Sequence, residues 1–161
     1  MRHVISILVN DQPGVLQRVS GLFGRRGFNI ESITVGSSEE PGLSRMVIVS
    51  RGDEKTMEQI SKQLYKLIDV AKVVHLSEQP MVARELALIK VGDEPAERPE
   101  VLGVVDTFRA TVVDVGPNSL IVQVVGDSDK IDAMVELLKP YGIKELTRTG
   151  VTAMTRGMNL K

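Results

Sequence analysis

The sequence predicts an α+β protein made of two tandem βαββαβ units, which is the ferredoxin-like arrangement. Apolar runs of strand length, such as residues 4–9, are bounded by turn residues. Between these runs, apolar residues recur at three- and four-residue spacing, which indicates helices. The same order stands on both sides of the polar, proline-containing segment 77–80. We therefore expect one unit in residues 1–78 and a second in residues 79–161.

The first unit is predicted to contain four strands and two helices. The strands cover residues 4–9, 29–36, 43–50 and 70–76, and the helices have their apolar positions at Val15, Val19, Leu22 and Phe23 and at Met57, Ile60, Leu64, Leu67 and Ile68. Gly27 suits the position after the first helix, and Asp53 can cap the second. Alternation breaks in strand 29–36, because Ile30 and Ile33 fall on opposite parities, and either a bulge or burial against two different surfaces would explain this.

The second unit repeats the order with little residue identity to the first, so the repeat is structural. Its strands cover residues 84–91, 110–115 and 119–125 with a last strand inside 143–154, and its helices have their apolar positions at Val101, Val104, Val105 and Phe108 and at Ile131, Met134, Val135 and Leu138. Asp127 or Ser128 caps the second of these helices, and Pro140 and Gly142 end it.

Composition limits the possible functions. The 161 residues are 42% apolar and 25% charged, as in globular proteins, and the net charge is −1. No strong field would therefore attract nucleic acid or an anionic membrane. The sequence has no cysteine, which excludes disulfides and thiolate chemistry. Its apolar runs are too short to span a membrane. Folding is expected to start near His3 without a leader, which favours the cytoplasm, or a plastid for a trimmed plant protein.

The sequence shows no arrangement of catalytic residues. His3 and His75 fall in predicted strands without a partner at the spacing of a metal ligand or a catalytic base. The acidic residues Asp93, Glu94, Glu97 and Glu100 could hold a divalent ion, but they lie in a proline-interrupted loop and are interpreted as a solvated charge cluster.

The stretch from Asn10 to Leu16 is the strongest candidate site. It joins a buried strand to a helix, so the amides of Gly14, Val15 and Leu16 and the positive end of the helix dipole would suit a carboxylate. Asp11, next to them, would suit an ammonium group. Together these groups describe a site for a free amino acid. The alternative is plain punctuation, with Asp11 as the helix cap and Gly14 serving the turn.

A second copy of the chain is expected to complete the fold. Strands 4–9 and 43–49 carry apolar residues on both parities, whereas the two helices can cover only one face of a four-stranded sheet. The predicted cover is a symmetric partner, with edge strand 29–36 pairing with its mate.

The stretch Asp11–Leu16 followed by Gly27-Phe28-Asn29-Ile30 resembles the ACT domain, a small amino-acid-sensing module. The similarity extends through residues 27–32, 43–46, 63–70, 84–90, 112–115 and 148–151 to the regulatory (small) subunit of acetohydroxyacid synthase, also called acetolactate synthase. It covers essentially the whole chain and identifies residues 1–78 as the ACT domain and 79–161 as the C-terminal domain of such a subunit.

This resemblance implies a partner, the large catalytic subunit, which binds thiamine diphosphate, Mg²⁺ and FAD and condenses pyruvate with a 2-oxo acid. The chain itself would carry no cofactor, raise the activity of that subunit and make it sensitive to valine, or to another branched-chain amino acid, in branched-chain amino acid biosynthesis. The implied effector site spans a homodimer: Asp11, Gln12, Gly14, Val15 and Leu16 of one copy face Asn29 and Ile30 of the other. Relatives often have asparagine where this chain has Asp11.

Other functions are weighed against this one. An ACT-type sensor could regulate another enzyme or transcription instead. A transcription regulator would need a basic DNA-reading element, and the even charge and lack of a helix-turn-helix pattern count against it. A standalone enzyme is disfavoured because no nucleophile has a base at a suitable spacing.

Overall fold

The computed structural model describes residues 1–92 and 94–157, and the chain forms two compact units. The first contains residues 1–82 together with the described part of 151–161, and the second contains residues 83–150. The second unit is thus shorter than the predicted range 79–161, because residues 151–157 belong to the first unit.

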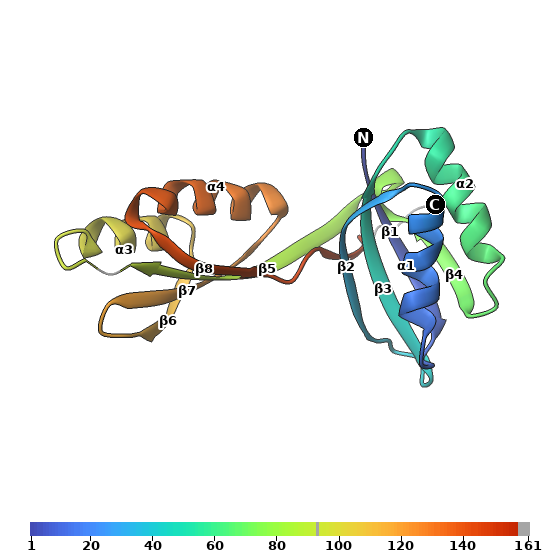
Figure 1. The fold of residues 1–161 in the computed structure, drawn as a ribbon, viewed down its shortest axis with the longest axis horizontal. Coiled ribbons are helices and arrows are strands. Elements are labelled where there is room, and N and C mark those ends of the chain that lie inside the picture. The colour runs from blue at the N-terminus through green and yellow to red at the C-terminus, as the bar shows by residue number, and fades with distance from the viewer. Residues whose placement is uncertain (93, 158–161) are drawn as a thin grey trace. The chain divides into compact units, whose positions relative to one another are not determined.

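The first unit has the predicted βαββαβ order and a sheet in the order β2-β3-β1-β4, with both helices on one face (Figure 1). Its elements are β1 Arg2–Asn10, α1 Val15–Arg25, β2 Asn29–Ser37, β3 Leu43–Arg51, α2 Glu54–Tyr65, β4 Val70–His75 and the 3-10 turn η1 Leu76–Glu78. Neighbouring strands in the sheet are antiparallel. The fold predicted for this part of the chain is confirmed.

The core of the first unit lies between its helices and its sheet. It is built from Ile5, Ile7, Val9, Val15, Val19, Leu22, Phe23, Met46, Ile48, Met57, Ile60 and Leu64. Helix α1 ends as predicted: Gly27 has φ 72°, and the Phe28 amide donates back to the Phe23 carbonyl at 2.9 Å. The rings of Phe23 and Phe28 meet edge to face with centroids 6.4 Å apart, so the helix end is fixed to the start of β2.

Two local predictions for the first unit are confirmed. The Asp53 carboxylate accepts from the Thr56 amide at 2.7 Å and caps α2. The pairing of β2 with β3 shifts register between Ile30 and Ser32, which places a bulge, one of the two explanations considered, at Glu31.

The second face of the first sheet has a cover that the sequence did not reveal. Strand β9, Thr152–Thr155, follows Val151 and belongs to the first unit. Val151 and Ala153 are buried, the Thr34 hydroxyl donates to the Val151 carbonyl at 3.3 Å, and the Arg156 amide donates to the Pro80 carbonyl at 2.9 Å. Part of the face assigned to a second copy is therefore covered by the chain's own C-terminal segment.

The second unit also has the predicted order, with sheet order β6-β7-β5-β8 and its helices on one face (Figure 1). Its elements are β5 Met81–Gly92, which begins in the first unit, α3 Arg98–Thr107, β6 Thr111–Val115, β7 Ser119–Gly126, α4 Ser128–Leu138, the 3-10 turn η2 Lys139–Tyr141 and β8 Ile143–Arg148. Of the two caps considered for α4, Asp127 is the one used, accepting from the Lys130 amide at 2.9 Å.

The last predicted strand, inside residues 143–154, proves to be two strands. Gly150 has φ 85°, a conformation that interrupts β structure and favours glycine, and it separates β8 from β9. The apolar pattern continues across this break because Val151 and Ala153 are buried on the other unit.

Candidate functional site

The turn between β1 and α1 is built on Gly14. Gly14 is the N-cap of α1 with φ 85° and ψ −4°, and no side chain caps the helix. Asp11 therefore does not cap α1, so that part of the alternative interpretation is wrong, whereas Gly14 does serve the turn as that interpretation expected. Pro13 lies just before the helix and not within its first turn. The helix start is left open, with its backbone at the surface because Gly14 is exposed.

The backbone hydrogen bonds of the turn decide which amides remain available. The Asp11 amide donates to the Gly42 carbonyl at 2.9 Å, which anchors the turn to the loop before β3. The Val15 amide donates to the Gln12 carbonyl at 3.3 Å, so one of the three amides expected to be free has an acceptor. Within residues 1–92 and 94–157, the amides of Gly14 and Leu16 have no acceptor.

The side chains of the turn divide into core and surface. Val15 is 3% exposed and belongs to the core, so only its backbone could meet a ligand. Leu16 is 46% exposed, and Asp11 and Gln12 are exposed as well. The turn thus presents a carboxylate, an amide side chain and an apolar side chain around the open helix start.

A cation that sequence reasoning missed lies against this turn. Arg18 Nη1 is 3.0 Å from the position that a Cβ on Gly14 would take. Arg18 Nε donates to Asp69 Oδ2 at 2.7 Å, and the Asp69 carbonyl accepts from the Asn10 amide at 2.8 Å. Asp69, 8% exposed, therefore fixes the guanidinium beside Gly14. The sequence did contain a signal for this contact, because Arg18 follows Gly14 by four positions and residues four apart are neighbours on a helix surface.

Asn29 and Ile30 do not lie beside the turn in the same chain. Asn29 pairs with Arg51 at one end of β3, whereas Asn10, where the turn begins, pairs with Leu43 at the other end. Eight residues of extended strand separate the two ends by roughly 25 Å. One copy of the chain therefore does not bring the two halves of the predicted site together.

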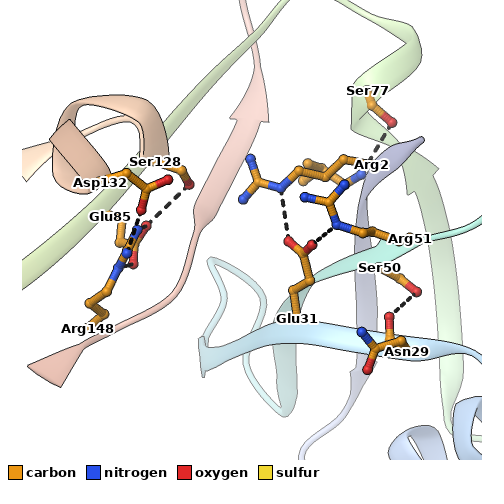
Figure 2. Close-up of polar contacts among 11 residues, drawn as sticks. Arg2, Asn29, Glu31, Ser50, Arg51, Ser77, Glu85, Ser128, Asp132 and Arg148 are labelled. Atoms are coloured by element: carbon orange, nitrogen blue, oxygen red, sulfur yellow. Dashed lines mark hydrogen bonds and ion pairs between the residues drawn. The ribbon is translucent and has the colours of Figure 1, made fainter. Parts of the chain in front are cut away.

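Asn29 begins an edge strand that ionic contacts hold in place. Figure 2 shows the Glu31 carboxylate between Arg2 and Arg51, with Arg2 Nε donating to Oε2 at 3.1 Å. Partial burial favours a higher pKa for Glu31, but hydrogen bonds from Arg51 and Arg2 outweigh it and hold the pKa below its ordinary value. The Ser50 hydroxyl donates to the Asn29 carbonyl at 2.8 Å. The start of β2 is thus fixed, while Asn29 itself remains exposed.

In the second unit, Arg148 serves the fold. Arg148 donates through Nε to Glu85 Oε1 at 2.6 Å and through Nη2 to Oε2 at 3.0 Å, and its Nη1 donates to Asp132 Oδ1 at 2.6 Å (Figure 2). The hydrogen bond to Glu85 raises the pKa of the Arg148 guanidinium, and Asp132 adds to this against the opposing effect of burial. Glu85 is 5% exposed and also accepts from the Ser128 hydroxyl at 3.2 Å.

Both histidines make structural contacts. His3 Nε2 lies 3.0 Å from the Gly52 carbonyl, and His75 hydrogen-bonds with Ser61, so both rings join structural elements. Asp93 lies outside the described residues, and in the described part of the chain no cluster of three His, Cys, Asp or Glu residues could hold a metal ion. No helix among the described residues is long and apolar enough to cross a membrane.

Comparison with known proteins gives consistent matches over both units. A family model for the small subunit of acetolactate synthase matches residues 84–157, and a model for the AHAS small subunit-like ACT domain matches residues 5–72. The probable acetolactate synthase small subunit of Methanothermobacter thermautotrophicus is 58% identical over 96% of this chain and 93% of the relative. The acetolactate synthase small subunit of Bacillus subtilis is 52% identical over 100% and 94%. The crystal structure of the small subunit from Thermotoga maritima superposes with a TM-score of 0.89 at 46% identity, covering 97% of this chain and 98% of that one.

Proposed function

The chain belongs to the family of acetolactate synthase small subunits, and on that premise we propose that it makes acetolactate synthase responsive to valine. In this proposal it raises the activity of the large catalytic subunit and transmits feedback inhibition in branched-chain amino acid biosynthesis. The thiamine diphosphate, Mg²⁺ and FAD of the reaction are held by the catalytic subunit, and this chain supplies only regulation.

The carboxylate of valine would bind at the open start of α1. Among the described residues the Gly14 and Leu16 amides have no acceptor, and they lie at the positive end of the helix dipole. Arg18, held beside Gly14 by Asp69, adds a full positive charge at the same place. Because Arg18 Nε is taken by Asp69, its Nη groups are the ones available to a ligand carboxylate.

The ammonium and side chain of valine would be recognised across a homodimer. Asp11 offers a carboxylate from one copy, and Asn29 of the partner subunit offers a side-chain carbonyl. The side chain would meet exposed Leu16 and Ile30 of the partner subunit. Such an apolar pocket separates valine from leucine or isoleucine by only about 1–3 kcal/mol, so these amino acids would compete.

The dimer is inferred from β2, which is an edge strand of its sheet. Antiparallel pairing of two copies of β2 about a twofold axis places the Asn29 end of each strand beside the Ser37 end of the other. Asn29 of one copy would then lie near the turn of the other, although the two are separated by roughly 25 Å within one chain. Valine would then bind one relative placement of the two copies better than another, and that difference in affinity limits the effect on the catalytic subunit.

The observation that carries the proposal is Gly14, a left-handed helix N-cap without a capping side chain and with Arg18 against it. We expect Gly14→Asp to abolish valine binding in isothermal titration calorimetry of the full chain while sedimentation still shows a dimer. Gly14→Asn carries the same backbone strain without the charge, so it separates electrostatic repulsion from strain. Gly142→Asp is the matched control, because Gly142 has φ 86° and open space around it. Unchanged valine affinity in Gly14→Asp would refute the site.

A further inference from the structure

A second concave site lies on the face of the first sheet that the helices do not cover. It is an open pocket of about 250 Å³ beside β9, and all its lining residues belong to the first unit. Leu8, Val74 and Leu76 form an apolar wall, and Ala153 and Met154 of β9 form another side. None of the residues that line the pocket belongs to the Gly14 turn, so the two sites are separate.

The hydroxyl of Ser6 opens into this pocket. Ser6 lies in the middle of β1, between Val47 of β3 and Val74 of β4, and the residue as a whole is 8% exposed. Among the described residues no buried side-chain nitrogen or oxygen atom lacks a hydrogen-bond partner, so the Ser6 hydroxyl, which has no protein partner there, is in contact with solvent in the pocket. It is therefore available to hydrogen-bond a ligand.

Two cations flank the same part of the sheet. By register, Leu8 lies between Arg45 of β3 and Lys72 of β4, and directly opposite residues on one face of a sheet are neighbours. Arg45 Nη1 donates to Glu39 Oε1 at 2.7 Å, so its charge is largely balanced. Lys72 has no ion pair with another described residue, although Glu39 is near enough to interact with it electrostatically. The lining of the pocket thus contains two cationic side chains beside apolar walls.

We propose that this pocket binds a short aliphatic carboxylate. Lys72 supplies the counter-charge, Ser6 a hydrogen bond, and Leu8, Val74 and Leu76 contact the alkyl part. The pocket volume is below the range of about 300–1,000 Å³ usual for drug-sized ligands, which favours a small ligand. A free acid and a carboxylate side chain of a protein share this chemistry. We assign the pocket to a free acid, because β9 encloses one side of it and limits the approach of another protein.

The test uses sodium butyrate as the probe and amide chemical shifts of the full chain as the measurement. Butyrate is expected to shift the amides of Ser6, Leu8 and Val74 with millimolar affinity, and butan-1-ol to bind about tenfold more weakly. Lys72→Met should weaken butyrate by about tenfold, and Ser6→Ala by a few-fold. Lys62→Met, on exposed α2, removes an equal charge away from the pocket and should change nothing.

Three results would overturn the assignment. The first is the absence of shifts at these amides, and the second is an equal effect of Lys62→Met, which would indicate general charge attraction. The third is displacement of butyrate by the catalytic subunit together with weaker subunit association in Lys72→Met, which would assign the pocket to a carboxylate of that protein. Titrating the same variants with valine measures the site at Gly14 separately, so a failure of one site can be distinguished from a failure of the other.

Discussion

Replacing Arg148 by methionine should destabilise the second unit severely. The substitution removes both hydrogen bonds to Glu85 and the one to Asp132, while the stem of the side chain is preserved. Glu85, 5% exposed, is then left as a buried carboxylate that still accepts a hydrogen bond from the Ser128 hydroxyl but has lost its guanidinium partner. Breaking a buried pair in this way costs about 3–5 kcal/mol.

This cost is comparable to the whole stability of the second unit. A unit of about 70 residues is stable by about 4–10 kcal/mol at 0.05–0.15 kcal/mol per residue. We therefore expect Arg148→Met to lower the urea midpoint by about 2 M, for a slope of about 2 kcal/mol per M. Hydrogen exchange read by mass spectrometry should speed up in peptides from β5 and β7, while peptides from β1 keep their protection.

Two further variants make this argument refutable. Replacing Glu85 and Arg148 together by methionine removes the orphaned charge, so the double variant should be more stable than Arg148→Met alone. Lys139→Met breaks an exposed pair with Glu136 and should cost only about 0.3–0.5 kcal/mol. A loss below about 1 kcal/mol for Arg148→Met, or a double variant weaker than the single one, would show that the buried pair does not hold the second unit together.

Three other predictions test the first unit. The folded-state pKa of Glu31 lies below its unfolded value near 4.5, so the contribution of Glu31 to folding stability is present above that pH and is lost as the pH falls through the folded pKa. Urea midpoints measured from pH 6 to pH 3 should therefore fall less steeply in Glu31→Gln than in the unchanged chain. Ala153→Asp places a charge at a position that is 6% exposed and should cost about 3 kcal/mol, whereas Thr152→Asp at the exposed neighbouring position should be nearly neutral; equal effects on thermal unfolding would contradict the cover by β9. Val35→Asp adds a charge to the apolar side of the edge strand and should weaken the dimer by about tenfold in sedimentation equilibrium, and an unchanged dimer would exclude pairing through β2.

Local patterns were sufficient for most of the fold. The parity change after Ile30 gave the bulge at Glu31 as one of two explanations, and Asp53 was recognised as a cap, because both signals lie within a few residues. Apolar residues on both faces of β1 correctly required a second cover for the sheet. They could not show that the cover is Val151 and Ala153, because nothing in a strand's pattern names the distant segment that packs on it.

The candidate site shows the same limit. Gly14 was found from its turn, and the structure gives it a left-handed backbone without a side-chain cap. Arg18 was overlooked because an arginine on a helix surface is ordinary, and only its ion pair with Asp69 fixes it beside Gly14. The position of Asn29 relative to the turn depends on a second chain, which a single sequence does not place.

Because β9 pairs with β5 but is grouped with the first unit, this unit is completed late in synthesis. The ribosome synthesises residues 83–150 before the segment that covers this sheet, so the first unit leaves the exit tunnel with its second face bare. Apolar residues on this face, such as Leu8 beside β9, therefore gain their cover only when residues 151–155 have been synthesised. A chain truncated before residue 151 would lack part of the cover of the unit formed by residues 1–82.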